Sequence, residues 1–494
     1  MRDRASPLQI VQVNSSDIGG GAEKVALDLF QAYRKRGLDS HFVVGKKFSN
    51  DPDVLLLASN AYRSRWARLC GDAGSSLLPI VGKMLDVSNA RSLVQFLGEP
   101  RRFWKIRCGQ EDFDFPGTCR LLELTPKRPD IIHCHNLHGG YFDLKALSWL
   151  SQQVTTLLTL HDSWLLSGHC AHSFGCERWK IGCGQCPDLT IYPAIRQDAT
   201  AFNWKRKRNI YAQSRLYVAT PSSWLMQMVE QSMLAPSITE NRVIPNGVDL
   251  TVFHPGEQHR VREILGIRQD VKVLLFVGNA TRSNRWRDYC SLEAAVRLVA
   301  HRLQNERLIL ICLGEAGRHE RIGSAEAWFV GYQKDPATVV RYYQAADIYV
   351  HPAIVDTFPN TVLEALACGI PVVATAVGGI PEQVKGLYID DSLAQLSDAN
   401  LYESEEATGA LVPSKNVQVM ATAIEILLRR EALRVQLGEN ASQDARQRFD
   451  LELQVKRYLE WYDEIRGKKV RGSSSSRLPD LTRTKFSRML NYST

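Results

Sequence analysis

The chain has 494 residues, of which 44% are hydrophobic and 23% charged, with 33 glycines, 20 prolines and 11 cysteines. This ordinary globular composition excludes collagen-like, disordered and disulfide-scaffold proteins. At roughly 100–200 residues per domain, the length predicts two or three domains. No apolar run approaches the roughly 18 residues of a membrane-spanning helix. Residues 1–6 are charged and lack the apolar core of a signal peptide. We therefore expect a cytoplasmic protein.

The formal net charge of +8 is concentrated in two segments. Residues 63–107 carry nine basic and three acidic side chains, and residues 467–494 carry seven and one. The second segment is rich in serine and is expected to be a disordered tail. The first also contains Trp66 and Trp104, so we predict peripheral contact with an anionic membrane on its cytoplasmic face, or with a lipid-linked acceptor. The alternative is an inserted helical subdomain with a solvated basic face. No nucleic acid is expected, because the basic segments contain no known recognition signature.

Strands and helices alternate along the first half of the chain. Residues 8–13 are predicted to form a buried strand, 19–21 a glycine turn, and the apolar spacing from residue 22 to 33 indicates a helix. Further strands are predicted at residues 41–44, 130–133, 155–160 and 216–220. This alternation is typical of a parallel sheet covered by helices.

A second alternating series follows the polar residues 255–270. Its predicted strands are 272–277, 307–313, 347–351 and 371–375, and its predicted helices are 291–304, 336–345, 361–368, 417–430 and 451–465. The economical fold is α/β, with two doubly wound parallel-sheet, Rossmann-like domains facing a cleft. Ligands are expected at the carboxyl ends of the strands.

The richest chemistry lies between residues 346 and 384. Asn360 is expected to cap the helix at 361–368, whose free N–H groups would form an anion site suited to a diphosphate. Asp356 precedes this helix and Glu364 lies within it, and carboxylates near a cleft can accept hydrogen bonds from vicinal hydroxyls. The spacing alone is equally compatible with a capped surface helix that carries a solvated glutamate.

Several motifs of this stretch occur together in one known family. Glu-Ala-Leu-Ala follows Asp356 at 364–367, Gly-Ile-Pro-Val-Val stands at 369–373, and Gly-Gly-Ile-Pro-Glu at 378–382. With residues 20–22, 221–223 and 244–249, they resemble the family-four retaining glycosyltransferases with the GT-B fold. The resemblance covers most of residues 8–430 and points to a bacterial exopolysaccharide or lipopolysaccharide-type subgroup.

The resemblance implies roles for the matched residues. His161 and Asp356 would be catalytic: His161 would reach the donor sugar and β-phosphate and donate a hydrogen bond or proton, and Asp356 would bind the sugar hydroxyls. Asp356 stands where glutamate is commoner in the family, which affects the sugar accepted. Glu364 would hold the ribose hydroxyls. The other implied donor-binding residues are Gly20, Gly21, Asn246, Phe358, Pro359, Asn360 and Thr361.

The family's diphosphate-binding Arg and Lys have no direct match. The usual Lys-Gly pair is missing after the strand at 272–277, and the candidates are Arg282, Arg285 and Arg287. A guanidinium can clamp phosphate oxygens through two hydrogen bonds. The alternative is that these arginines lie on a solvated loop.

Histidines and cysteines raise the question of a metal. His133 and His135 on a strand end would alternate faces, so we expect these two, with His138, to pack and line the acceptor side rather than bind metal. Four cysteines with the pattern C-x5-C-x6-C-x2-C could hold structural zinc, or be reduced, redox-sensitive thiols: Cys170, Cys176, Cys183 and Cys186. No cofactor is expected for catalysis.

The predicted organisation has four parts. Residues 1–250 would form the acceptor-binding domain, with a basic amphipathic insertion at 60–125 and a Cys-rich loop at 168–190. Residues 251–435 would bind the nucleotide sugar, 436–466 would form a helix returning to the first domain, and 467–494 the tail. The predicted activity is retaining transfer of a sugar to a glycan or lipid-linked saccharide in cell-surface polysaccharide biosynthesis. A sugar-nucleotide epimerase, a phosphorylase or an inactive nucleotide-sugar-binding scaffold are the alternatives.

Overall fold

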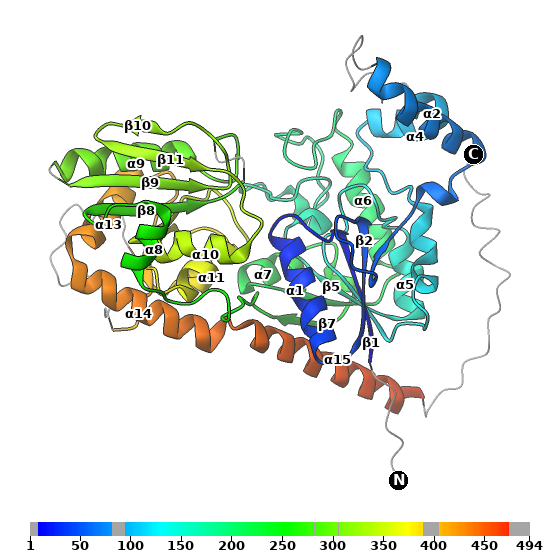
Figure 1. The fold of residues 1–494 in the computed structure, drawn as a ribbon. Helices are drawn as coiled ribbons and strands as arrows, with labels where there is room; N and C mark the ends of the chain where they lie inside the picture. The colour runs from blue at the N-terminus through cyan, green and yellow to red at the C-terminus, as the bar shows by residue number, and fades with distance from the viewer. Residues whose placement is uncertain (1–7, 82–93, 280–281, 305, 389–404, 474–494) are drawn as a thin grey trace. The chain divides into compact units, whose positions relative to one another are not determined.

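Two parallel β-sheets with helices on both faces form the larger of two compact units, residues 1–455 (Figure 1). The computed structural model describes residues 8–81, 94–279, 282–304, 306–388 and 405–473. The second unit comprises residues 456–494, of which the described part, 456–473, is helical. Within these described ranges no helix is long and apolar enough to span a membrane.

The first sheet has the strand order β3-β2-β1-β4-β5-β6-β7, and all its strands are parallel. Its strands are β1 (Gln9–Ser16), β2 (Asp39–Lys46), β3 (Val54–Leu56), β4 (Ile131–Cys134), β5 (Thr155–Thr159), β6 (Leu216–Thr220) and β7 (Ile238–Val243). The helices of this half are α1 (Gly21–Lys35), α2 (Arg65–Val81), α4 (Pro100–Arg107), α5 (Ala146–Gln153), α6 (Thr200–Tyr211) and α7 (Ser223–Glu230).

The second sheet has the order β10-β11-β9-β8-β12-β13-β15-β14, with only the β10–β11 pair antiparallel among its described strands. Its strands are β8 (Val271–Val277), β9 (Arg307–Leu313), β10 (Glu320–Ile322), β11 (Ala325–Val330), β12 (Ile348–His351), β13 (Val372–Thr375), β14 (Gly386–Tyr388) and β15 (Gly409–Val412). The helices are α8 (Gln258–Leu265), α9 (Tyr289–Arg302), α10 (Pro336–Ala345), α11 (Asn360–Ala367), α12 (Ile380–Gln383), α13 (Val417–Arg429), α14 (Glu431–Arg448) and α15 (Leu451–Ser473).

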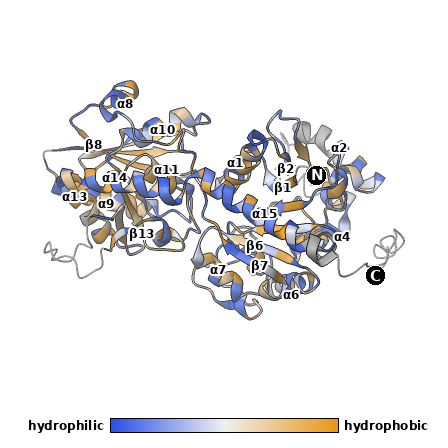
Figure 2. Cartoon of the chain, turned by 90° about the horizontal axis from the view of Figure 1, so that it is seen from below, coloured by the Kyte–Doolittle hydropathy of each residue, from blue (hydrophilic) through white to orange (hydrophobic). Residues whose placement is uncertain are grey.

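The apolar strands are buried on both faces, as parallel strands between helices require. In the second sheet, α9 and α13 close one apolar core, and α8, α10, α11 and α14 close the other. Figure 2 shows the strands β8 and β13 as predominantly hydrophobic. Local signals also begin the helices: the Asp335 carboxylate accepts hydrogen bonds from the backbone N–H groups of Ala337 and Thr338 at the start of α10.

Strand order places the switch points of the two sheets. The first sheet reverses direction between β1 and β4, and the second between β8 and β12. Loops that leave the carboxyl ends of such neighbouring strands diverge and open a crevice where ligands bind. The segments that follow β1, β4, β8 and β12 contain Gly20, His135, Arg287 and Asp356 respectively.

The two Rossmann-like domains expected from the sequence are confirmed. Differences concern the periphery: α14 was not expected, because Gly438, Ala441, Ser442 and Ala445 give a buried face of small residues rather than an apolar stripe. The chain at 436–466 forms parts of two helices, α14 and α15, and α15 continues to Ser473, into the predicted tail. Residues 474–494 of that tail and 82–93 of the basic insertion lie outside the described residues.

Candidate active site

Two buried carboxylates flank the start of α11 beside the switch point of the second sheet. The Glu364 side chain lies in α11, and its Oε2 accepts a hydrogen bond of 2.8 Å from the Tyr343 hydroxyl. Burial raises the pKa of Glu364 to about 7, and the opposing effects of Tyr343 and Lys24 are smaller. Glu364 is therefore a carboxyl group that gains or loses its proton near neutral pH.

Asp356 is in the opposite electrostatic state. Although burial acts to raise its pKa, the Arg287 guanidinium, 2.6 Å from its Oδ2, and His351, 3.5 Å from the same oxygen, hold the pKa of Asp356 well below its usual range. Burial and the Arg287 charge lower the pKa of His351 to about 4. Asp356 is thus an ionised carboxylate with a fixed partner, presented by the loop between β12 and α11.

A glycine allows the Asp356 loop to pack closely. Gly378 has a φ of +58°, and a Cβ on it would lie 1.8 Å from the Asp356 carbonyl oxygen. Any other residue would be strained in this left-handed conformation and would displace the loop. The Gly-Gly motif at 378–379 therefore acts structurally, by supporting Asp356.

Three predicted donor-binding residues from separate parts of the chain meet at the start of α11. The Asn360 Nδ2 group donates to the Gly21 carbonyl oxygen at 3.1 Å, and the Asn246 Nδ2 group donates to Asn360 Oδ1 at 3.0 Å. The Oδ1 atom of Asn246, which is buried, has no hydrogen-bond partner among the described residues. A buried carbonyl without a donor costs free energy, so a ligand hydroxyl or water is expected there.

The expectation that Asn360 caps α11 is wrong. Pro359 occupies the cap position and Asn360 is the first helical residue, because its amide is engaged by Gly21 and Asn246. The neighbouring predicted residues are in place: Phe358 and Pro359 are buried, and the Thr361 hydroxyl accepts a 2.8 Å hydrogen bond from Tyr349. Gly20 lies on the facing loop, where its N–H donates to Glu23.

A chain of side chains in the first sheet ends at His161. His135 lies 3.0 Å from His161 (Nδ1 to Nε2) and 2.6 Å from Gln12 (Nε2 to Oε1). With the Gln12 oxygen as acceptor, His135 donates from Nε2, and its Nδ1 accepts from the Nε2–H of His161. Burial lowers the pKa of His161 to about 4 and that of His135 well below its usual range. His161 is therefore neutral at pH 7, not poised near its ordinary pKa.

The two halves of the site are also in direct contact. The Thr357 hydroxyl, next to Asp356, donates to the His161 carbonyl oxygen at 2.6 Å. Glu382, from the motif at 378–382, accepts from the N–H groups of Ser223 and Trp224 at 2.7 Å each and thereby caps α7. Motif residues of the second sheet thus hold the first sheet beside the carboxylates.

Of the three candidate arginines, Arg287 alone lies beside Asp356. Arg282 pairs with Glu315 at 3.0 Å and Glu320 at 2.8 Å. Arg285 pairs with Asp188 at 2.7 Å. Arg287 is thus the guanidinium nearest the predicted donor site.

The histidines at 133 and 135 do not point to opposite faces. Their ring centroids lie 4.2 Å apart, because β4 ends at Cys134 and His135 has already left the strand. His133 bonds to Thr159 inside the core, and His138 pairs with Asp162 at 2.8 Å. These contacts agree with the expectation of packing.

The four cysteines of the loop at 168–190 do not fit a zinc ion in this arrangement. Across the described part of the chain, no group of three or more His, Cys, Asp or Glu side chains is placed to hold a metal. The Cys183 sulfur accepts from the Gly168 N–H, and the Cys186 sulfur faces His169 and the Asp188 carbonyl. Burial raises the pKa of Cys170 to about 11 and of Cys183 to about 12, so these thiols are protonated.

Sequence reasoning missed several residues of the site. His351 ends the predicted strand at 347–351, so its place at the switch point was detectable from the strand assignment. Tyr343 gave no signal, because it looks like any apolar residue of α10. Gln12 and His135 are joined only by the pairing of β1 with β4.

Comparisons with known proteins agree with this geometry. Residues 19–252 match the family model described as Glycosyltransferase Family 4, and residues 257–444 match that of Glycosyl transferases group 1. The putative colanic acid biosynthesis glycosyl transferase WcaC of Escherichia coli K12 is 25% identical over 74% of this chain and 83% of its own. A D-inositol 3-phosphate glycosyltransferase 2 of Catenulispora acidiphila is 31% identical over 67% and 72%.

A solved structure shows the same fold. The Anabaena protein HepE in complex with UDP-glucose superposes with a TM-score of 0.55 at 16% identity, over 92% of this chain and all of that one. At this identity the likeness concerns the fold alone. Together with the two matching family models and the relative at 31% identity, it supports one assignment. The chain belongs to the family-four glycosyltransferases and is a glycosyltransferase with the GT-B fold.

Proposed function

We propose that this enzyme transfers a sugar, with retention of its anomeric configuration, from a nucleotide-sugar donor to a hydroxyl of a glycan or lipid-linked saccharide. The observation that carries the proposal is the pair Asp356 and Glu364 on either side of the α11 start, beside a switch point. The UDP-glucose of the HepE complex supports a nucleotide-sugar donor, and the name of the colanic acid relative supports a role in cell-surface polysaccharide biosynthesis.

In this proposal each group has a distinct task. Glu364 accepts hydrogen bonds from the ribose hydroxyls, and Asp356 accepts them from the donor sugar. Arg287 and the free N–H groups at the start of α11 favour the diphosphate. Neutral His161 is fixed by His135 and acts as a hydrogen-bond partner of the donor sugar. His135 is a positioning residue, because it acts through His161.

The proposed step needs no protein nucleophile. The bond between the anomeric carbon and the diphosphate oxygen breaks, and a bond from that carbon to the acceptor oxygen forms on the same face. The acceptor proton passes to the departing diphosphate oxygen. The low pKa of Asp356 supports this assignment, because an ionised carboxylate held by Arg287 is suited to binding hydroxyls.

The affinity for UDP-glucose is expected to depend on the ionisation of Glu364. The ionised carboxylate accepts hydrogen bonds best, and its pKa in the free protein is about 7. Affinity should therefore rise as pH increases from 5.5 to 8, by roughly 10–30-fold, and level off above neutrality. Calorimetric titration of UDP-glucose across this range measures the effect, since its diphosphate is fully ionised throughout.

The Glu364→Gln variant is the matched control for this titration. It should bind UDP-glucose more weakly than the wild type at pH 8 and show no pH dependence between 5.5 and 8. If UDP-glucose does not bind at all, GDP-, ADP- and dTDP-glucose are titrated in the same way. A pH-independent affinity in the wild type, for whichever donor binds, would contradict the role given to Glu364.

The basic insertion supports the further proposal of contact with an anionic membrane. Large apolar side chains of α2, α4 and the segment before α4 are exposed, among them Trp66 at 61% and Trp104 at 57%. The exposed basic residues beside them are Arg65, Arg68, Arg101, Lys105 and Arg107. Apolar groups for the interface and cations for anionic headgroups together give an amphipathic membrane-binding surface.

Vesicle co-sedimentation tests this surface. The protein should sediment with phosphatidylcholine vesicles that contain phosphatidylglycerol and much less with phosphatidylcholine alone. The double variant Trp66→Ser and Trp104→Ser should lose most of the binding. An exposed aromatic residue of the second domain, Tyr332, provides the control variant Tyr332→Ser, which should sediment like the wild type. Equal binding to both vesicle types would refute the proposal.

A further inference from the structure

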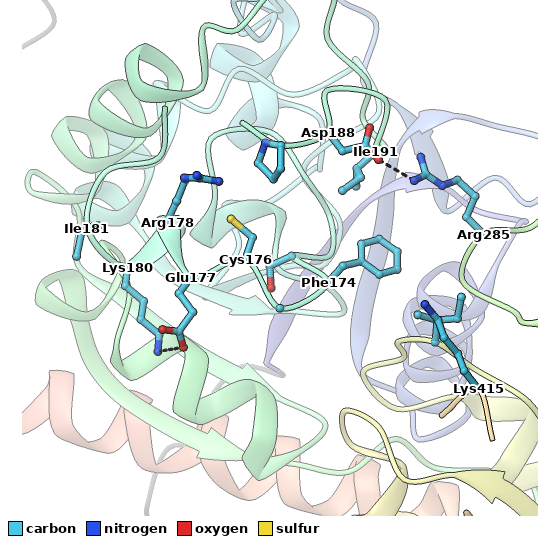
Figure 3. A pocket seen from close by; sticks show the side chains of 14 residues that line it. Phe174, Cys176, Glu177, Arg178, Lys180, Ile181, Asp188, Ile191, Arg285 and Lys415 are labelled. Carbon is cyan, nitrogen blue, oxygen red and sulfur yellow. Dashed lines mark hydrogen bonds and ion pairs between the residues drawn. The ribbon is translucent and has the colours of Figure 1, made fainter. Parts of the chain in front are cut away.

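A cavity of about 860 Å³ opens next to the candidate active site, and the Cys-rich loop forms most of its wall (Figure 3). Its lining comprises residues 173–178, 180, 181, 187, 188 and 191 from the loop region, with Arg285, Ile354 and Lys415 from the second domain. This volume lies within the range of sites that bind small ligands. None of the donor-binding residues proposed above lines it.

The cavity adjoins the Asp356–Arg287 pair. Ile354 lies two residues before Asp356, and its N–H donates to the Trp286 carbonyl oxygen at 2.9 Å. The Trp286 ring in turn stacks on Phe174, with ring centroids 4.8 Å apart and planes 10° apart. A molecule in this cavity would therefore lie beside the residues that bind the donor sugar. It is the place where an acceptor is expected.

The charge of the wall is uneven. Four cationic side chains and two carboxylates line the cavity. Both carboxylates are already paired, Glu177 with Lys180 and Asp188 with Arg285, each at 2.7 Å. Figure 3 draws these two ion pairs as dashed lines, and Arg178 and Lys415 have none. Within the described ranges, neither cation has an ion-pair partner.

Both cations are held by well-anchored backbone. The Arg178 carbonyl oxygen accepts hydrogen bonds from Ile181, Gly182 and Cys183, and the next residue, Trp179, is buried in the core. Lys415 has a φ of +63°, a left-handed conformation that favours glycine, and it immediately precedes the residue that caps α13. A lysine retained at such a position has a side chain that contributes something a glycine would not.

We propose that this cavity binds the sugar acceptor and that Arg178 and Lys415 recognise an anionic group on it, a carboxylate or a phosphate. This inference rests on the proposed function, because it names the acceptor class of that same reaction. Guanidinium and ammonium groups form charge-assisted hydrogen bonds with both kinds of anion. The exposed face of Phe174 would lie against the sugar ring.

Matched pairs of probes test the charge requirement. Methyl β-D-glucuronide is compared with methyl β-D-glucoside, and α-D-glucose 1-phosphate with methyl α-D-glucoside, by calorimetry on the full chain saturated with UDP. The wild type should bind an anionic probe at least about tenfold more tightly than its neutral partner. The carboxylate and phosphate pairs show which anion is preferred. Equal affinity within both pairs, or no binding of any probe, would overturn the inference.

Variants assign the effect to the two cations. Arg178→Gln and Lys415→Gln should each weaken binding of the preferred anionic probe about tenfold and leave the neutral probe unchanged. The exposed Arg321 on β10 is outside the cavity, and Arg321→Gln should change neither affinity. Equal weakening of both probes by the Arg178 and Lys415 variants would also overturn the inference. If UDP and all nucleotide sugars fail to bind, the proposed function fails first, whereas donor binding without anion preference refutes only this inference.

Discussion

Replacing His161 by alanine is expected to lower kcat for sugar transfer by about 10²–10³-fold, the usual effect of removing one hydrogen-bonding group aimed at a transition state. The affinity for the nucleoside diphosphate should change little, because Glu364 and α11 provide those contacts. Neutral His161 is held in one orientation by His135, whose Nδ1 lies 3.0 Å away. The measurement is the initial rate of nucleoside diphosphate release at saturating donor and acceptor.

The positioning role of His135 provides a second readout for this prediction. His135→Phe keeps a ring in the buried space but removes both hydrogen bonds, so kcat should fall less than in His161→Ala, with KM for the donor nearly unchanged. The double variant should be no slower than His161→Ala alone, because His135 acts only through His161. Multiplicative losses in the double variant, or a His161→Ala enzyme with wild-type kcat, would contradict this account.

Replacing Lys207 by methionine is expected to reduce the free energy of unfolding by about 3–5 kcal/mol. The ammonium group is fully buried, pairs with Glu111 at 3.0 Å, and donates to the carbonyl oxygens of Trp164 at 2.8 Å and Ser167 at 3.1 Å. Its loss leaves a buried carboxylate and two carbonyl groups without a donor. Urea unfolding followed by tryptophan fluorescence measures the change.

Two variants separate burial of the charge from loss of packing. Lys207→Met combined with Glu111→Leu should recover part of the stability, because a matched apolar pair no longer buries an uncompensated charge. Lys180→Met breaks a partly exposed pair with Glu177 and should cost at most about 1 kcal/mol. Similar losses for Lys207→Met and Lys180→Met would show that the buried pair has no special weight. Since Lys207 holds the segment after His161, its loss should also reduce activity.

The sequence predicted the parts of the fold that depend on local pattern. The strands at 216–220 and 307–313 and the helix at 336–345 have the expected bounds, because uniform apolar runs and a proline start define them. It did not predict α14, whose buried face consists largely of small residues. The short edge strand β10 was also missed, since it buries only Ile322.

The candidate site was predictable where motifs fix it and not where distant segments meet. Asp356 and Glu364 were identified from one stretch of 38 residues and lie where that stretch predicts. The partner of Asp356 was ambiguous among three arginines, because only tertiary contacts separate Arg287 from Arg282, which pairs with Glu315 and Glu320. The protonation of His161 was also unpredictable, since it depends on the depth at which β5 ends.

Transfer of a labelled sugar tests the central claim most directly. The purified enzyme is incubated with nucleotide sugars that carry a radiolabelled sugar and with a lipid-linked saccharide fraction, and label in the lipid phase is compared with released nucleoside diphosphate. The account predicts that one donor gives label in the acceptor in equal amount to the nucleoside diphosphate, and that His161→Ala gives little of either. A donor that binds but yields neither product, or one whose sugar is altered while still attached to its nucleotide, would contradict it.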